Sequence, residues 1–329
     1  MKKVLLLIVA AVLALSVVSC GGKAKKDKII IKLAFSQSNT VPLYKGFEEW
    51  ARLVKERTNG NVEIQIFPSL QLGNDEDVIE QAIQGAPIAV LTDAARMGNY
   101  VKDMGILMMG FFTDNYDEAL KVTESESFAK WEQELAEKND IRVIAFNFYD
   151  GPRDFYTHKP INVPADLKGQ RIRTIGSPVC IESIQALGAI PVAMSWGEAY
   201  NAVQSKALEG VEVQATSAFS TRIYEIEEYL TKTDHFQLIN GIIMGEKFFK
   251  TIPPEYQQII IDSAKEAAAN NAALVIKISA ENEAAMEQAG LKIVRPDLAP
   301  FKAAVEKAYT KMGFTQLRNR IYKEIGKTK

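Results

Sequence analysis

Side chains with the capacity to contact a ligand lie near the ends of three short apolar segments between residues 166 and 214. These side chains, in chain order, are Arg173, Thr174, Ser177, Met194, Trp196, Val213 and Gln214. Arginine has the most distinctive chemistry among them, because its planar, permanently charged guanidinium donates two parallel hydrogen bonds to a carboxylate. The residue types in this stretch therefore favour the binding of an organic anion.

The three apolar segments are expected to be β-strands that place these side chains. They cover residues 171–175, 190–194 and a stretch that starts near Val211, with helices expected at 178–187 and 197–205 between them. Strands that alternate with helices predict βαβ units and a parallel sheet. Because ligands bind beyond the carboxyl ends of such strands, the polar side chains lie where a binding site is expected.

Residue patterns typical of enzymes and of nucleic-acid-binding proteins are missing from the sequence. His158 and His235 lie in unrelated contexts, which disfavours a Ser–His–Asp triad and a histidine-rich metal site. The paired acids Glu227 and Glu228 are expected on a charged, solvated helical face. A net charge of −2 over 329 residues gives no reason to expect a nucleic-acid partner. We therefore expect no catalytic residue, no metal and no cofactor.

The stretch from 166 to 214 resembles the signature region of the solute-binding proteins of tripartite ATP-independent periplasmic (TRAP) transporters, the DctP family. The shared residues are Leu-Lys-Gly-Gln-Arg-Ile-Arg at 167–173, Leu-Gly-Ala-Ile-Pro at 187–191, Met-Ser-Trp-Gly-Glu-Ala-Tyr at 194–200 and Glu-Gly-Val-Glu at 209–212. The resemblance implies a two-lobed α/β fold, similar to type II periplasmic binding proteins, with a long helix across both domains. It also implies a protein that captures an organic acid between the lobes. The small and large membrane subunits of the transporter would then receive the acid for uptake driven by an ion gradient.

The resemblance assigns possible binding roles to several residues. It makes Arg173 the carboxylate-binding arginine and Arg153 a second arginine that helps to hold the ligand, with Trp196 packed on it. A surface position for Arg173 and a core position for Trp196 are the alternatives. Asp75 and Asp93 match positions that face the cleft in some members, and each could equally be a helix cap or a structural acid.

One position departs from the family pattern, because Val213 stands where several acid-binding members have asparagine. An amide that could donate a hydrogen bond is thus replaced by an aliphatic side chain. The change predicts a ligand less polar than sialic acid, with an aliphatic or aromatic tail.

The amino-terminal residues are expected to be a lipoprotein signal peptide. Lys2 and Lys3 precede an apolar run at 4–15, which is short for a membrane-spanning helix. Residues 17–19 and Cys20 fit a lipobox, so that residues 1–19 would be removed and Cys20 would be lipidated. Residues 20–28 would form a polar tether that holds the protein to a membrane of the periplasm or cell envelope. An ordinary signal peptide with an incidental cysteine is the alternative.

The rest of the chain is expected to form two domains joined by crossing segments. The expected divisions are 28–150 plus about 239–278 for domain I, 151–238 plus about 279–305 for domain II, and 306–329 for a C-terminal helical region. The turn-rich segment 147–153 is the expected first hinge, and the chain is expected to cross back at 235–241. Residues 254–289 are expected to form one helix of ~54 Å, with a break near Asn270 as the alternative. The run 104–112, with its three methionines, is expected in the core.

The sequence is also compatible with other functions on this fold. The same kind of receptor could deliver its signal to a sensor, or could bind a more hydrophobic acid. An enzyme would need a titratable pair or a nucleophile at the cleft, and a surface lipoprotein would act through protein contacts alone.

Overall fold

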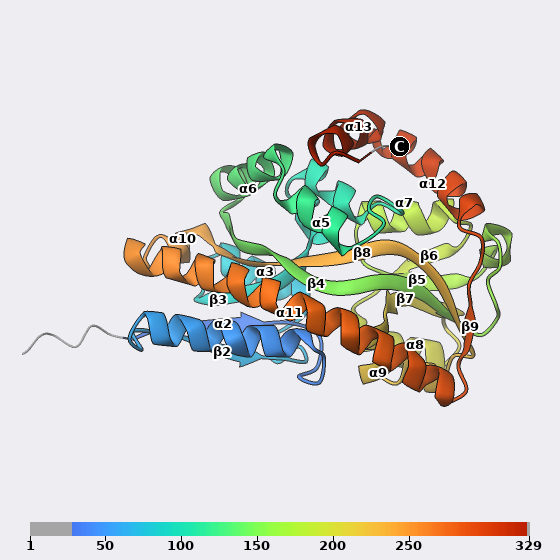
Figure 1. Cartoon of the computed structure of the whole chain (residues 1–329), viewed down its shortest axis with the longest axis horizontal. Helices are drawn as coiled ribbons and strands as arrows, with labels where there is room; N and C mark the ends of the chain where they lie inside the picture. Colours follow the sequence, from blue (N-terminus) through green and yellow to red (C-terminus); the bar gives the residue numbers. More distant parts are fainter. Residues whose placement is uncertain (1–27, 328–329) are drawn as a thin grey trace, which may run out of the picture.

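The computed structural model describes residues 28–327, which fold around one nine-stranded sheet (Figure 1). The strand order is β2-β1-β3-β8-β4-β7-β5-β6, and β9 pairs with β8. The strands are β1 (Ile29–Ala34), β2 (Val62–Phe67), β3 (Ile88–Asp93), β4 (Ile141–Thr157), β5 (Arg171–Thr174), β6 (Ile190–Ala193), β7 (Gly210–Gln214), β8 (Tyr229–Gly245) and β9 (Lys292–Val294). The helices are α2 (Leu43–Arg57), α3 (Asp75–Ile83), α4 (Ala94–Met97), α5 (Tyr116–Thr123), α6 (Glu126–Asn139), α7 (Pro178–Ala186), α8 (Trp196–Gln204), α9 (Ala215–Ser220), α10 (Glu246–Phe249), α11 (Pro254–Gln288), α12 (Ala299–Met312) and α13 (Thr315–Glu324), with 3₁₀ turns η1 (Lys102–Met108), η2 (Pro164–Leu167) and η3 (Ile223–Glu225).

Two sets of parallel strands flank the antiparallel pair β4 and β8 and define two lobes. In the first lobe, β1 pairs in parallel with both β2 and β3. In the second lobe, β5 pairs in parallel with both β6 and β7, as the sequence predicted. The strands β3 and β7 pair with β8 and β4, so their carboxyl ends at Asp93 and Gln214 approach the middle of the molecule. The two-lobed α/β fold is therefore confirmed.

The segment 147–153, expected as a turn-rich crossing between the lobes, crosses as part of a continuous strand rather than as a turn. It belongs to β4, which runs for 17 residues and pairs with the equally long β8. The pairing register shifts between Tyr149 and Gly151, and Gly151 has a φ of 106°. A bulge of this kind accommodates glycine and proline inside a strand, because the extra residue need not donate to the ladder. The turn-forming residues thus bend a continuous strand, and residues 235–241 likewise lie within β8.

Residues 254–288 form the single helix α11, which confirms the expected long helix (Figure 1). The helix packs on α2, on β4 and on α9, so it contacts both lobes. Asn271, where a break was the alternative, is 6% exposed, and its amide donates to the Pro42 carbonyl at 3.0 Å. Gly46 of α2 allows this approach, since an added Cβ would lie 3.0 Å from the Asn271 side chain. The asparagine therefore anchors the helix.

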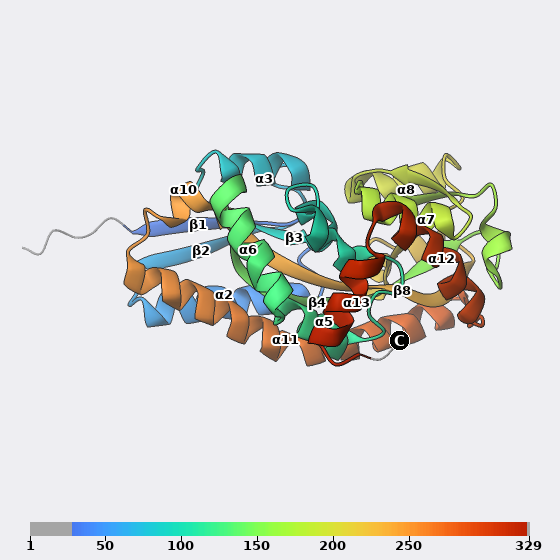
Figure 2. The ribbon, with the colours of Figure 1, turned by 90° about the horizontal axis from the view of Figure 1, so that it is seen from above.

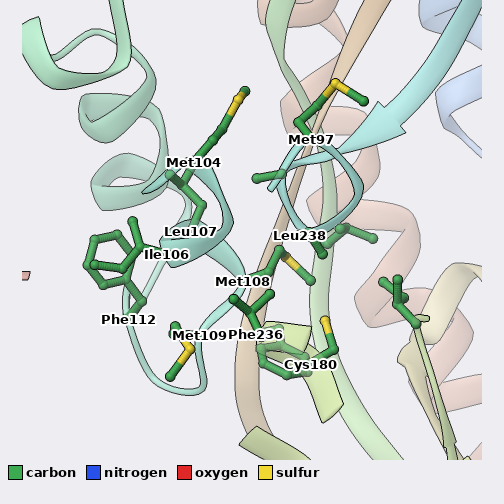
Figure 3. Packing of buried hydrophobic residues seen from close by; sticks show 14 of the residues in the cluster. Met97, Met104, Ile106, Leu107, Met108, Met109, Phe112, Cys180, Phe236 and Leu238 are labelled. Carbon is green, nitrogen blue, oxygen red and sulfur yellow. The ribbon is translucent and has the colours of Figure 1, made fainter. Parts of the chain in front are cut away.

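The methionine-rich run 104–112 is buried, as expected, in a cluster that both lobes share (Figure 3). Met104, Met108 and Met109 lie in it with Cys180 of α7. Burial raises the pKa of the Cys180 thiol well above its ordinary value, which opposes formation of the nucleophilic thiolate. Figure 2 shows α3 and α6 over one face of the first lobe and α7 and α12 over the second.

The expectation that Glu227 is solvated on a helix is wrong. Glu227 lies between η3 and β8, is 4% exposed, and its Oε2 is 2.6 Å from Nδ1 of His158. Burial raises the pKa of Glu227 to about 9. Its neighbour Glu228 is exposed, because burial alternates where the chain enters β8.

Candidate functional site

A narrow cavity of about 60 Å³ lies where the two lobes meet β4 and β8. The sequence-predicted residues in its wall are Asp75, Asp93, Arg153, Arg173, Trp196 and Val213. The wall also holds polar residues for which the sequence predicted no role, namely Ser36, Gln37, Thr92, Arg96, Asp150, Ser217 and Asn240. The remaining predicted residue, Cys20, lies outside the described part of the chain.

Arg173 is a buried cation whose guanidinium has no ion pair with any residue from 28 to 327. It lies on β5 and is 3% exposed, and its Nε donates to the Met194 carbonyl at 3.0 Å. The guanidinium carbon lies 5.3 Å from the ring centroid of Trp196, within cation–π distance. Burial and the charge of Arg153 lower the pKa of Arg173 to about 10. An anion in the cavity would supply the missing partner.

Arg153 is buried as well, but its guanidinium is held by Glu212. Its Nε and one terminal nitrogen both donate to the Glu212 carboxylate, and that terminal nitrogen also donates to the Glu212 backbone carbonyl at 2.7 Å. The other terminal nitrogen is 3.2 Å from Oε1 of Gln214. Burial acts to lower the pKa of Arg153, yet the charge and hydrogen bonds of Glu212 outweigh it and raise the pKa. The planar fork of Arg153 is thus already occupied.

Asp75 and Asp93 line the cavity, and both are bonded to Arg96. The Arg96 guanidinium donates to Asp75 at 2.8 Å and also to Asp93. Asp93 accepts a further bond from the Arg96 backbone nitrogen at 2.9 Å and so caps α4, whereas Asn74 caps α3. Burial raises the pKa of Asp75 despite the charge of Arg96. In this part of the wall the positive charge of Arg96 is therefore bonded to two carboxylates, those of Asp75 and Asp93.

Val213 and Trp196 supply apolar parts of the wall. Val213 is 2% exposed, lies on β7 and packs in an apolar cluster of the second lobe. Trp196 opens α8 and is half-buried beside Arg173. A ligand in the cavity can therefore meet an aromatic face next to the unpaired guanidinium.

Asp150 lines the cavity where amide side chains from both lobes converge. Gln37, which follows β1, donates to its Oδ2 at 2.7 Å, and Gln214 of β7 donates to the same atom at 2.5 Å. Gln37 and Gln214 also both donate to the Ser217 hydroxyl, at 3.1 and 3.0 Å. Asp150 is fully buried, and burial raises its pKa to about 7 although Gln37 and the charge of Arg153 act to lower it.

Replacement of Asp150 by asparagine is expected to reduce the pH dependence of stability. The folded protein keeps the Asp150 proton up to about pH 7, whereas an unfolded chain loses it near pH ~3.9. The folded state binds more protons between these values, so the free energy of unfolding falls as the pH rises. Urea unfolding at about pH 5 and about pH 8 measures this fall. Identical falls in Asp150→Asn and in the unaltered protein would contradict the assignment.

The arginines of the wall favour an anion, and the described lining includes no cysteine, lysine or histidine that could act as a nucleophile or base. His235 is fully buried outside it, with Nδ1 at 2.7 Å from the Thr233 hydroxyl. Between residues 28 and 327, no group of three or more His, Cys, Asp or Glu side chains is placed to hold a metal ion. In the same range, no helix is both long enough and apolar enough to cross a membrane.

Comparison with known proteins places the chain among extracellular binding proteins. Residues 33–316 match the family described as bacterial extracellular solute-binding protein, family 7. A solute-binding protein of Sulfitobacter sp. strain NAS-14.1 is 29% identical over 226 residues, which are 68% of each chain. A TRAP periplasmic solute-binding protein from Ochrobacterium anthropi with bound L-fuconate has a TM-score of 0.87 and 31% identity, over 91% of this chain and 99% of its own. Its counterpart from Actinobacillus succinogenes with bound L-galactonate has a TM-score of 0.87 and 27% identity, over 90% and 99%.

Proposed function

The chain belongs to family 7 of the bacterial extracellular solute-binding proteins, and from this premise we propose that it captures a hydroxylated organic acid in the central cavity. The acid is then delivered to the membrane subunits of a TRAP transporter. The unpaired guanidinium of Arg173 is the observation that carries this proposal. A buried cation without a partner is costly, and a carboxylate supplies two charge-assisted acceptors for it.

The polar wall of the cavity supports a hydroxylated acid over an aliphatic one. Asp150, Gln37, Ser217 and Asn240 add hydrogen-bonding groups to the wall that holds the arginines. The solved relatives with bound L-fuconate and L-galactonate hold acids of this kind. The less polar ligand predicted from Val213 is the competing proposal, and a ligand panel separates the two.

Capture is proposed to involve closure of the lobes about β4 and β8. In this proposal domain I comprises 28–150 and about 239–278, and domain II comprises 151–238 and about 279–305. A ligand that contacts both lobes binds the closed arrangement better and shifts the population towards it. Gln37 of the first lobe and Ser217 of the second already meet at Asp150, which supports closure around this point.

We also propose that the protein is anchored to a membrane of the cell envelope through a lipid on Cys20. The sequence pattern before Cys20 supports this, and the family is periplasmic. Labelling of cells with a radioactive fatty acid tests the anchor, since Cys20→Ser should remove the label. A variant that keeps the label would contradict it.

A thermal-unfolding panel with the purified protein tests the proposed ligand class. The panel contains L-fuconate, L-galactonate and D-glucuronate, with succinate, 4-methyl-2-oxopentanoate and the neutral sugar L-fucose for comparison. A ligand at 100 times its dissociation constant adds ~2.7 kcal/mol, which raises the midpoint by roughly 5–10 °C. We expect this rise with a sugar acid and none with L-fucose. A rise with 4-methyl-2-oxopentanoate alone would favour the less polar ligand, and equal rises with L-fucose would contradict carboxylate recognition.

A further inference from the structure

A second cavity, of about 440 Å³, lies between α5 and α11. It is lined by the segment that begins α5, by β4 and β8, and by α11, which are seen together in Figure 1. It shares no lining residue with the cavity at Arg173. Nothing in the proposed capture of an organic acid uses this space.

The walls of the second cavity carry excess negative charge. Asp117, Asp234 and Glu283 line it, and within the described residues Asp117 has no ion pair. Lys232 lies behind the wall, with its ammonium 3.1 Å from Asp234, 2.7 Å from Glu283 and 2.6 Å from buried Asp154. Three carboxylates therefore share one ammonium group. Asp114 also lines the cavity, but its carboxylate is paired with Lys302 and Lys327.

Aromatic and hydroxyl groups complete the walls. The rings of Tyr116 and Tyr149 have centroids 4.8 Å apart, and both line the cavity. Ser279 is 7% exposed and lines it too, and its buried hydroxyl oxygen has no hydrogen-bond partner in the described structure. A buried hydroxyl without a partner calls for a ligand or water, because such groups are costly to leave unsatisfied. Ile276, which is 49% exposed, forms an apolar rim.

We propose that this second cavity binds a small organic amine. Its ammonium group would lie among the carboxylates of Asp234 and Glu283 and the Ser279 hydroxyl, and its carbon chain against Tyr116 and Ile276. An ammonium group donates to several acceptors at once and is attracted to tyrosine faces. The excess negative charge disfavours an anion. A metal ion does not fit, because the acids of the described chain nowhere converge in a metal-binding group.

Calorimetry with putrescine as the probe tests the proposal on the purified protein. We expect saturable binding of putrescine that weakens with added salt, weaker binding of choline because it lacks N–H donors, and no binding of neutral 1,4-butanediol. No putrescine binding up to ~10 mM would overturn the proposal. Equal binding of the diol would also overturn it, because the carboxylates would then have no role. These outcomes are independent of whether the central cavity binds an organic acid.

Two tryptophan variants on α11 place the bound amine. Ile276→Trp adds bulk at the rim from the solvent side and should weaken putrescine binding at least about tenfold. Leu274→Trp is the matched control, because Leu274 is 36% exposed on the same helix but does not line the cavity. An equal loss in the two variants, or no loss in Ile276→Trp, would overturn the placement.

Two variants of α11 that each remove one carboxylate give a second test of amine binding. Glu283→Gln should weaken putrescine binding, whereas Glu281→Gln should not, since Glu281 is 55% exposed beside Lys277 and lies outside the cavity wall. Both variants remove one negative charge from α11, so an effect of net charge alone would weaken them equally and would overturn the proposal. Circular dichroism and the unfolding midpoint establish that each variant is folded before binding is measured.

Discussion

Replacement of Arg173 by alanine is expected to abolish measurable binding of the organic acid without destabilising the protein. Truncation of one partner of a buried charge pair costs ~2–5 kcal/mol, which corresponds to roughly 30-fold to several thousand-fold in affinity. In the absence of ligand, Arg173 is buried and has no carboxylate partner among residues 28–327. Its removal relieves a desolvation cost, so the free energy of unfolding should stay the same or rise.

Arg173→Lys tests whether the shape of the guanidinium matters as well as its charge, because lysine keeps the charge and loses the planar fork. We expect the lysine variant to bind far more weakly than the unaltered protein, since an ammonium group cannot donate two parallel bonds to a carboxylate. The measurement is titration calorimetry with the acid that gives the largest thermal shift. Binding within about threefold of the unaltered protein in Arg173→Ala would remove Arg173 from the site.

Arg171 supplies the matched control for this experiment. It lies two residues earlier on β5 and has the same strand parity, but its side chain is 43% exposed and pairs with Glu209 at 2.5 Å. It does not line the central cavity. Arg171→Ala should therefore leave the affinity for the acid unchanged, and a loss equal to that of Arg173→Ala would mean that the effect comes from the strand rather than the guanidinium.

The sequence was most informative where local pattern decides structure. The alternation of apolar strands and helices from 166 to 214 predicted the parallel order of β5, β6 and β7 and the position of Arg173 near a strand end. The long apolar and glycine-free pattern likewise predicted α11. These features depend on contacts within a few tens of residues, so the spacing of apolar residues along the sequence is enough to predict them.

The sequence was least informative where the structure joins distant segments. Gln37, Asp150 and Asn240 belong to a loop after β1, to β4 and to β8, and only the sheet order brings them together. Gly151 and Pro152 are typical of a turn when only their neighbours in the sequence are considered. They fit inside β4 because of a bulge against β8, and the paired residues of β8 lie more than 80 residues away in the chain. The buried charge of Glu212 had no local signal either, since its partner Arg153 is on another strand.

Replacement of Glu212 by alanine is expected to lower the free energy of unfolding by ~3–5 kcal/mol, because it leaves Arg153 buried without its carboxylate. The loss extends beyond the ion pair, since the Thr174 hydroxyl also donates to Glu212, at 2.7 Å. Urea unfolding measures the change. The control is Glu209→Ala, which breaks an exposed pair: Arg171 lowers the pKa of Glu209 to about 2, yet solvent screening limits the expected cost to about 1 kcal/mol or less.

The double variant Arg153→Met with Glu212→Leu separates the two roles that Arg153 could have. Apolar replacement of a whole buried ion pair is often nearly neutral, so we expect it to recover most of the stability that Glu212→Ala loses. If the double variant is stable and still binds the acid, Arg153 acts on the fold and Arg173 alone holds the carboxylate. If it is stable and fails to bind, the terminal nitrogen that faces Gln214 contributes to the ligand site. A double variant as unstable as Glu212→Ala would contradict the view that the unpaired charge of Arg153 causes the loss.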